Sequence, residues 1–468
     1  MQNNVLLIVL DALRADHTSV HGYDRDTTPC LEALAEDGDS VDQAFAAAPW
    51  TPPSHASMFS GVYPSSHGYL DSSMSFDPPH PPLAELLCEE GYSTFGAVRN
   101  GHIDSQQSVT RGFEEFGDIY RLPRIPNSLS DLKSDYFDLW PGYLKVAYHS
   151  LRAERRPSEY VTCEYIKHQI QSGEKPFFGF VNINSPHTPY APPQPFRSQF
   201  ESFDRDEVDM AAVRALSNIK QSGTNRFMGG EIDASTRVWN AVKDWYDGEV
   251  RFADSLVGDL IQTLRRENLY EETTIIVVGD HGEHFGEHGR AGHQFSLFDE
   301  LLHVPLVVKP AESWQTIESS AELVSLVDLY PTILDGLDLG IPASVQGESL
   351  FQSHSRETLF AEYGKPKSQL SSLESSLHGT IDPEVRSKLD TALQCARTQQ
   401  FKYIKAHSAE DETFEITGKD PKETEVSTVE HTDLRVKIDC ALGDNLNVVE
   451  EQDLDEARKE NLRELGYI

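Results

Sequence analysis

The chain has 468 residues, 38% of them hydrophobic, and its 76 Asp and Glu against 40 Lys and Arg give a formal net charge of −36. The hydrophobic share supports a buried core and excludes wholesale disorder. The acidity argues against unaided binding to nucleic acid or to an anionic membrane surface, which need patches of Lys and Arg, and no apolar run approaches the roughly 20 residues of a membrane span.

The acidic residues are spread from Glu32 to Glu460 rather than gathered in one tail. A uniformly acidic surface suits a protein that works in concentrated salt, because salt screens the self-repulsion and carboxylates hold water and cations. We therefore expect a halophilic protein. The five cysteines form no CxxC pair, so neither a disulfide framework nor a cysteine zinc site is indicated.

The chain opens with a short apolar run at residues 5–10 that ends at Asp11. The run is too short for the core of a signal peptide, and neither a basic segment nor a small-residue cleavage site surrounds it. It is instead typical of a central strand in a parallel sheet. The sequence therefore predicts a cytoplasmic protein whose fold begins at this strand.

Strand and helix patterns then alternate along the chain. Buried strands are predicted at residues 5–10, 94–98, 177–182, 274–278 and 304–308, and helices at 28–37, 81–90, 238–268 and 324–337. This alternation predicts a doubly wound α/β fold around a mostly parallel central sheet.

Two stretches interrupt the alternation, and we expect them to be insertions over the sheet. Residues from about 121 to 160 are rich in Pro, Arg and aromatic side chains, and residues from about 200 to 235 are polar. Insertions of this length commonly face a substrate.

Past residue 340 the pattern changes. Antiparallel strands are predicted at 401–405 and 413–416, and a last helix at 454–465. We therefore expect a catalytic α/β domain over residues 1–340 and a small C-terminal α+β subdomain over residues 341–468.

Polar side chains follow the ends of the predicted strands: Asp11, then Asn100 and His102, then His187, then Asp280 and His281. In open α/β sheets, ligands bind outside the carboxyl ends of the strands. Two Asp and one His that meet there suit a divalent metal with oxygen and nitrogen ligands. A single Asp at a strand end commonly caps the next helix, so it is the convergence that argues for a metal site.

The segment around Thr51 predicts a helix that ends near Gly61, with Thr51 as its N-cap and Pro52 as its first residue. Thr51 then has two interpretations. It is a plain cap, or it is a nucleophile, because a helix N-terminus also binds anions and a hydroxyl held there beside a metal is activated.

Ordered motifs run along nearly the whole chain outside the two insertions. They include Leu-Asp-Ala-Leu-Arg-Ala-Asp-His at residues 10–17, Thr-Pro-Pro-Ser-His at 51–55, Gly-Asp-His-Gly-Glu at 279–283 and Val-Asp-Leu-Tyr-Pro-Thr at 327–332. Together they resemble the sulfatases, a branch of the alkaline-phosphatase superfamily. The resemblance implies an α/β sandwich with a small C-terminal domain, one divalent metal, and hydrolysis or transfer of sulfate or phosphate esters.

The chain departs from the sulfatase pattern at the nucleophile. Sulfatases place there a Cys or Ser that is oxidised to formylglycine, with an Arg four residues later, whereas this chain has Thr51 and His55. Threonine cannot yield the aldehyde, so Thr51 would have to attack directly, as in related phosphodiesterases and phosphoethanolamine-type transferases.

The chain also departs from the sulfatase pattern at the metal ligands and at the basic residues. Asp11 is followed by Ala12 instead of a second Asp, and His281 stands where many sulfatases have Asn. One imidazole and fewer hard oxygens favour Mn²⁺ or Zn²⁺ over Ca²⁺, and Mg²⁺ stays open. Two lysines expected from the family are missing, and Asn100, His102 and His293 lie in their regions.

These residues predict a metal-dependent hydrolase of sulfate or phosphate esters, including esters of a glycan. We assign Asp11, Thr51, Asp280 and His281 to the metal, Thr51, His187 and His293 to catalysis, and His55, Asn100 and His102 to substrate binding; His284 and His288 are expected to be structural. Two alternatives stay open. One is a sulfuryl or phosphoryl transferase that acts on a glycan or lipid acceptor in surface-glycan biosynthesis, and the other is a non-catalytic relative that binds such glycans.

Overall fold

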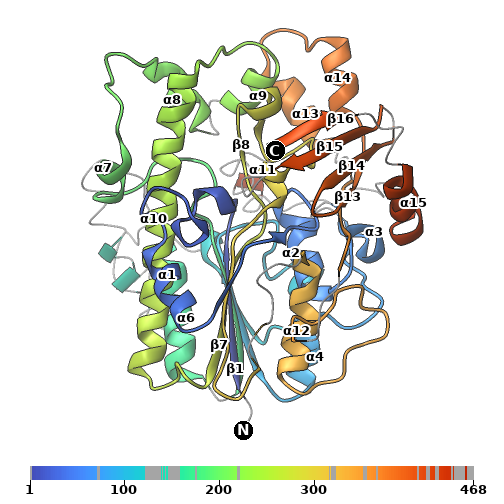
Figure 1. The fold of residues 1–468 in the computed structure, drawn as a ribbon. Coiled ribbons are helices and arrows are strands. Elements are labelled where there is room, and N and C mark those ends of the chain that lie inside the picture. The colour runs from blue at the N-terminus through green and yellow to red at the C-terminus, as the bar shows by residue number, and fades with distance from the viewer. Residues whose placement is uncertain are drawn as a thin grey trace.

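A computed structural model gives the fold of the chain (Figure 1). It describes residues 3–70, 74–121, 159–173, 176–218, 222–315, 323–351, 356–364, 367–407, 410–417, 422–426 and 432–443, with isolated positions between these ranges. The predicted insertion at 121–160 and the predicted helix at 454–465 lie almost wholly outside the described residues.

Within these ranges, seven strands form the central sheet in the order β2-β10-β7-β1-β6-β4-β5. Their bounds are Asn4–Leu10 for β1, Asp39–Val41 for β2, Ser93–Val98 for β4, Glu115–Asp118 for β5, Phe177–Ile183 for β6, Thr273–Gly279 for β7 and Leu306–Lys309 for β10. β1 lies in the middle and runs parallel to β6 and β7, whereas β10 is antiparallel to both of its neighbours. The predicted mostly parallel sheet is confirmed.

The residues of β1 show why the sheet needs helices on both faces. All seven are buried. Val5, Leu7 and Val9 belong to one hydrophobic cluster, and the residues between them, such as Leu6 and Ile8, belong to the other. Successive side chains of a strand point to opposite faces, so both faces must be covered.

Helices cover the two faces as separate layers (Figure 1). One layer holds α1 (Pro29–Glu36), α6 (Glu159–Ser172) and the long α10 (Thr236–Arg266). The other holds α2 (Thr51–Ser60), α4 (Leu83–Glu89) and α12 (Leu329–Gly336). The helices predicted at 28–37, 81–90 and 238–268 are confirmed, and so is the one predicted within 324–337, which spans Leu329–Gly336 after a capping box of Ser325 and Asp328.

The C-terminal part forms a separate five-stranded sheet among the described residues, in the order β12-β13-β14-β15-β16. The strands are Leu359–Tyr363, Leu393–Arg397, Phe401–Ala406, Glu412–Thr417 and Lys422–Val426, all antiparallel, and α15 (Thr432–Ala441) packs on β13 and β14. The two strands predicted here are confirmed.

The remaining elements are short. The strands are β3 (Ala44–Phe45), β8 (His284–Phe285), β9 (Ala291–Gly292) and β11 (Val324–Ser325), and the helices are α3 (Pro64–His67), α7 (Phe196–Phe200), α8 (Met210–Leu216), α9 (Gly223–Met228), α11 (Asp299–Leu302), α13 (Lys367–Ser376) and α14 (Pro383–Leu389). None of the helices in the described ranges combines the length and apolar character needed to cross a membrane.

The predicted insertion at 200–235 carries α8 and α9. The α9 helix contacts the β8–β9 hairpin on one side and α13 of the C-terminal part on the other, and Figure 1 shows α9 and α13 side by side. Asn225 donates a hydrogen bond to Ser376 at 3.1 Å. This insertion therefore links the catalytic sheet to the C-terminal part at the end of the sheet where the parallel strands terminate.

Candidate metal and catalytic site

The carboxyl ends of the central strands bring the predicted ligands together. Asp11 directly follows β1, and Asp280 and His281 directly follow β7. Leu10 lies opposite Gly279 in the sheet register, so the two aspartates leave adjacent strands at the same level. All three side chains are buried, and one ligand atom from each lies within 4.8 Å of the others.

Thr51 completes this group from the other direction, at the start of α2. Its hydroxyl oxygen is 3.2 Å from Nε2 of His281 and 3.5 Å from Oδ1 of Asp11. Nε2 of His281 is in turn 3.6 Å from Oδ1 of Asp11 and 3.5 Å from Oδ2 of Asp280. Four donor atoms thus face one another across one small volume.

The outer oxygens of the two aspartates are held by hydrogen bonds. Oδ2 of Asp11 accepts from the side-chain amides of Asn100 at 3.1 Å and Asn182 at 3.2 Å. Oδ1 of Asp280 accepts from the backbone N–H groups of Ala12 at 3.0 Å and His281 at 2.9 Å. The inner oxygen of Asp280, Oδ2, is buried and has no hydrogen-bond partner among the described residues.

His281 is oriented as a ligand by its backbone contact. Its Nδ1 donates to the carbonyl of Gly282 at 2.8 Å, which places the lone pair of the neutral ring on Nε2, the atom that faces the aspartates. Burial, and next the neighbouring imidazole of His293, lower the pKa of His281 to about 3. At neutral pH the ring is therefore uncharged, as a metal ligand must be.

The two carboxylates repel each other in this dry environment. Burial and then the charge of Asp11 raise the pKa of Asp280 well above its usual range. Burial also acts to raise the pKa of Asp11, but the imidazoles of His187 and His281 and the amide of Asn182 hold it below the usual value. A divalent cation between the carboxylates would remove this repulsion.

These observations fit a divalent metal. Ligand bonds of about 2.0–2.2 Å in a tetrahedral arrangement place neighbouring donor atoms about 3.3–3.6 Å apart. The four distances among Thr51, His281, Asp11 and Asp280 span 3.2–3.6 Å. The unpartnered Oδ2 of Asp280 points into the same volume, so all four residues would hold the ion.

The structure corrects the expected cap. The N-cap of α2 is Trp50, and Thr51 is the first residue of the helix, without a capping hydrogen bond from a side chain. The helix ends as predicted, at Gly61 in the left-handed conformation. The Thr51 hydroxyl contacts His281 and Asp11 and makes no capping hydrogen bond at the helix end.

The expected anion site on free N–H groups of this helix is also corrected. Pro52 and Pro53 have no N–H group, and the N–H of Ser54 donates to the carbonyl of Trp50 at 3.3 Å. Of the first three helical residues, two are prolines, so the helix start has fewer N–H groups than expected. The helix dipole still favours negative charge there.

His187 and His293 extend the site beside His281. The ring centroids of His281 and His293 are 4.6 Å apart, and those of His293 and His187 are 5.0 Å apart. Nδ1 of His293 lies 3.2 Å from Oε1 of Glu283, whose other oxygen accepts from Tyr190 at 2.9 Å. The three imidazoles form one row, and Glu283 orients the middle ring.

The family is settled by comparison with known proteins. The model for the family described as Sulfatase matches residues 3–339. The chain belongs to the sulfatase family. Among relatives of this sulfatase-family chain, arylsulfatase K from Bos taurus is 24% identical over 430 residues, which cover 86% of this chain and 73% of that protein. Sulfatases are ester hydrolases, and the chain is an enzyme of that class.

Solved structures agree with the fold. The phosphonate monoester hydrolase of Agrobacterium radiobacter has a TM-score of 0.66 and 20% identity, with 88% of this chain and 89% of that chain covered. A protein solved with its substrate D-glucosamine-2-N,6-O-disulfate has a TM-score of 0.62 and 17% identity, with 89% of this chain and 91% of that chain covered. The α/β sandwich and its C-terminal antiparallel sheet are thus those of the sulfatases.

The residues predicted to bind substrate have different neighbours in this sulfatase-family site. Nδ1 of His55 is 3.0 Å from the carbonyl of Thr51 and 3.6 Å from Oδ2 of Asp280, and its ring packs against Phe59 and Phe180. Burial lowers its pKa to about 4. His55 therefore contacts both Thr51 and Asp280 and helps to hold them in place.

Asn100 and His102 lie beside the metal ligands. Asn100 holds Asp11, as described above, and its side-chain oxygen accepts from the backbone N–H of His102 at 3.0 Å. The ring of His102 meets the edge of Trp50 at 5.7 Å between centroids. Asn100 thus orients a ligand, and His102 lies next to the start of α2.

Sequence reasoning missed Asn182 and Glu283. Asn182 is the last residue of the predicted strand at 177–182, and Glu283 ends the Gly-Asp-His-Gly-Glu motif. Both positions were available as signals, since polar residues at the end of a buried strand and within a site motif have few structural reasons to be there.

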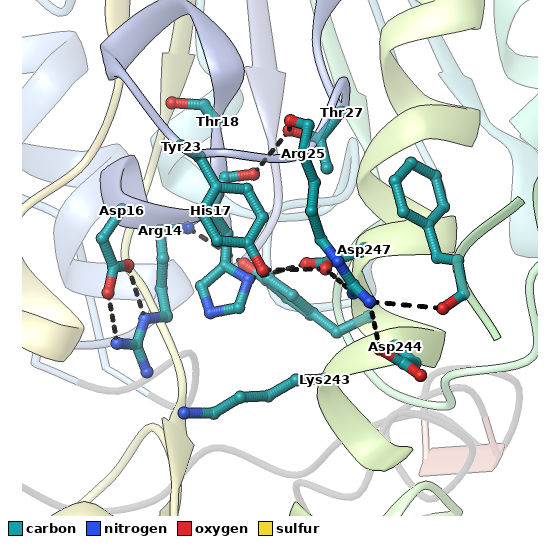
Figure 2. A network of polar contacts seen from close by, with 12 residues as sticks. Arg14, Asp16, His17, Thr18, Tyr23, Arg25, Thr27, Lys243, Asp244 and Asp247 are labelled. Atoms are coloured by element: carbon teal, nitrogen blue, oxygen red, sulfur yellow. Dashed lines mark hydrogen bonds and ion pairs between the residues drawn. The ribbon is translucent and has the colours of Figure 1, made fainter. Parts of the chain in front are cut away.

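A polar network fixes the segment after Asp11 (Figure 2). Asp247 of α10 accepts from Tyr23 at 2.9 Å, lies 2.7 Å from Nδ1 of His17, and pairs with Arg25. On the other side, Arg14 donates to the carbonyl of Glu283 at 2.9 Å. The segment is therefore tied both to α10 and to the loop that carries His281, which holds the ligands in register.

Proposed function

We propose that the chain is a metal-dependent hydrolase of sulfate or phosphate esters in which Thr51 is the nucleophile. One observation carries the proposal: the Thr51 hydroxyl lies 3.2 Å from Nε2 of His281 and 3.5 Å from Asp11, at a helix start that it does not cap. A hydroxyl held among candidate metal ligands is placed where a bound metal would activate it as a nucleophile.

Each residue then has a chemical role. Asp11, Asp280, His281 and Thr51 would hold the cation, which when bound neutralises the ester oxygens and favours the ionised hydroxyl. Asn100 and Asn182 keep Asp11 turned toward the site. Thr51 attacks in line, its oxygen forms a bond to sulfur or phosphorus, and the bond to the leaving oxygen breaks.

The row of histidines would serve the leaving group. His187 donates through Nδ1 to the carbonyl of Thr188 at 2.7 Å, so the proton-accepting nitrogen of its neutral ring is Nε2. His293, oriented by Glu283, lies between His187 and His281. We assign to His187 or His293 both the acceptance of the proton that Thr51 loses and its delivery to the leaving oxygen; water would then attack the Thr51 ester, releasing sulfate or phosphate and restoring the hydroxyl.

We infer that the ion is Mn²⁺ or Zn²⁺ rather than Ca²⁺. Ca²⁺ takes six to eight oxygen ligands at about 2.3–2.6 Å, whereas this site offers an imidazole and donor atoms at tetrahedral spacing. Mg²⁺, which prefers oxygen ligands in octahedral geometry, fits the imidazole less well.

Transfer to an acceptor other than water is the second candidate. Thr51, Asp11, Asp280 and His281 are each 0% exposed, and His187 is 1% exposed. A site so well shielded from water favours transfer of the sulfuryl or phosphoryl group to a glycan or lipid hydroxyl in surface-glycan biosynthesis. The sulfated sugar bound to one solved relative supports a glycan ester as the substrate.

We also propose that the enzyme works in the cytoplasm of a halophile. The net charge of −36 supports this, because it destabilises a compact chain unless salt screens the repulsion.

Turnover of the pure protein on an aryl sulfate, an aryl phosphate and an aryl phosphodiester, with and without a sugar acceptor, tests the proposal. Hydrolysis that requires Mn²⁺ or Zn²⁺ supports it, and a sulfated or phosphorylated sugar as the main product favours the transferase. A metal-loaded, folded chain that turns over none of these esters would indicate the binding-only relative instead.

A further inference from the structure

A second cluster of metal-ligating side chains lies away from the catalytic residues. His288, Glu300 and Glu423 each place one ligand atom within 4.8 Å of the other two. His288 belongs to the loop after β8, Glu300 to α11 and Glu423 to β16. The cluster therefore joins the loop of the catalytic site to the C-terminal sheet, where Figure 1 shows α11 beside β15 and β16.

Two buried carboxylate oxygens in this cluster have no hydrogen-bond partner. They are Oε2 of Glu300 and Oε2 of Glu423, and no described residue donates to either. The Glu423 side chain is only 2% exposed. A buried carboxylate oxygen without a donor is costly, so a ligand is needed to satisfy it.

The other oxygen of Glu423 is firmly held. Oε1 accepts from Nζ of Lys402 at 2.7 Å and from the backbone N–H of Asp299 at 3.2 Å. Lys402 also donates to Asp299 at 2.6 Å, and Arg397 donates to the second oxygen of that carboxylate at 3.0 Å. These contacts hold Oε1 and leave Oε2 as the oxygen of Glu423 that has no hydrogen-bond partner among the described residues.

His288 is held just as firmly. Its ring stacks on Phe298, with centroids 3.7 Å apart and planes 5° apart. Nε2 then lies 3.3 Å from Oε1 of Glu300. His288 also adopts a left-handed backbone conformation, with φ of 54°, which is unfavourable for a residue with a side chain. The backbone here is thus strained in the conformation that brings the ring to the glutamates.

We propose that His288, Glu300 and Glu423 form a second divalent-metal site, distinct from the catalytic one. One imidazole and two carboxylates are donors that suit Zn²⁺ or Mn²⁺, with water as a further ligand. Nε2 of His288 and Oε1 of Glu300 are 3.3 Å apart, the spacing of ligands around an ion, and every pair of ligand atoms lies within 4.8 Å, so rotation of the Glu300 carboxylate about its soft terminal torsion would close the remaining gap.

A metal ion bound at this site would link two parts of the chain. It connects β16 of the C-terminal sheet to the segment from Asp280 to His293, which carries the candidate ligands Asp280 and His281 as well as His293. An ion bound here stabilises the folded chain, because Glu423 is more than 120 positions away from His288 and Glu300 and joins them only in the native state. This inference does not rest on the proposed catalytic function.

The test is the number of Zn²⁺ ions bound per chain, from equilibrium dialysis followed by elemental analysis. We expect two ions in the wild type and one in His288→Gln and Glu423→Gln. We also expect one in Asp280→Asn, where the catalytic site is disabled, and none in the Asp280→Asn/His288→Gln double variant. Zn²⁺ at about a hundred times its Kd should raise the Tm of Asp280→Asn by roughly 5 °C and leave that of the double variant unchanged.

His378→Gln is the matched control. His378 and Glu231 form a similar pair, with Nδ1 2.9 Å from Oε2, in the absence of a third ligand, so this variant should bind two ions. His288 lies partly exposed, so His288→Gln decides the question where Glu423→Gln fails to fold. A His288→Gln chain that keeps every ion that the wild type binds would overturn the proposal. A wild type that binds one ion and loses it in His288→Gln would support this site and count against the catalytic one.

Discussion

The Thr51 hydroxyl and Nε2 of His281 lie 3.2 Å apart, although 230 positions separate them in the chain. Thr51 opens α2 on one side of the sheet, and His281 leaves the end of β7. Their approach brings the start of a helix next to the end of a strand, and a hydroxyl and an imidazole lone pair then face the same two carboxylates.

Replacing Thr51 separates catalysis from stability. Thr51→Ala should lose at least about 10³-fold in turnover, because the nucleophile is gone, while Thr51→Ser keeps measurable activity. Since Trp50 and not Thr51 occupies the cap position, we expect Thr51→Ala to cost only about 1 kcal/mol of unfolding free energy. Intact mass after brief incubation with substrate should show an adduct on the wild type alone. An active Thr51→Ala enzyme would assign the attack to another nucleophile.

The effect of Asp280→Asn on stability should depend on whether metal is bound. The variant should be more stable than the wild type without metal and less stable with it. Without metal, the variant removes a carboxyl group whose ionisation is opposed by burial and by the charge of Asp11, and it should be more stable than the wild type by about 1–3 kcal/mol. With Zn²⁺ or Mn²⁺ the order should invert, because a ligand and a charge are lost. Urea unfolding with and without chelator measures both. A wild type that is the more stable of the two in chelator would contradict the paired-carboxylate interpretation.

Asn182→Ala should weaken metal binding without removing a ligand. Asn182 and Asn100 donate to the same oxygen of Asp11, so either variant frees that carboxylate to turn, and we expect a fall of about 10–100-fold in affinity at the catalytic site. Titration in a His288→Gln background isolates that site. Because the two amides share one acceptor, the double variant should lose less than the product of the two single effects; unchanged affinity in both single variants would remove them from the site.

The protein should need salt to stay folded. Its net charge of −36 repels itself more strongly as the Debye length grows from about 3 Å at 1 M salt to about 30 Å at 0.01 M. We expect the Tm, followed by circular dichroism, to fall between these conditions. As a control, sucrose, a neutral stabiliser, should leave the difference in Tm between the two salt levels in place. An equal Tm at both salt levels would rule out the halophilic interpretation.

Buried histidines should make the fold sensitive to acid. Burial lowers the pKa of His67 to about 3, whereas the unfolded value is near 6.5. Between these values the unfolded chain binds a proton that the native ring does not, so stability is complete above pH 6.5 and declines as the pH falls. His67 alone contributes about 1.4 kcal/mol per pH unit. His67→Gln should make the decline shallower by one proton in urea unfolding at pH 8, 6 and 5.

The sequence by itself determined the sheet and the ligands nearest to it. The run at residues 5–10 is apolar on both faces, and such a strand is stable only between two layers of helices. Asp11, Asp280 and His281 could be placed together because the carboxyl ends of parallel strands share one edge. Local pattern and this one topological rule were sufficient.

Only the tertiary structure decided what Thr51 does and which residues support the ligands. A cap and a nucleophile have the same local sequence, and the difference is the direction of one hydroxyl relative to a residue 230 positions away. The amide of Asn182, the carboxylate of Glu283 and the cluster of His288, Glu300 and Glu423 are likewise contacts between distant segments. Side-chain direction and long-range packing fix such contacts, and neither leaves a periodic pattern in the chain.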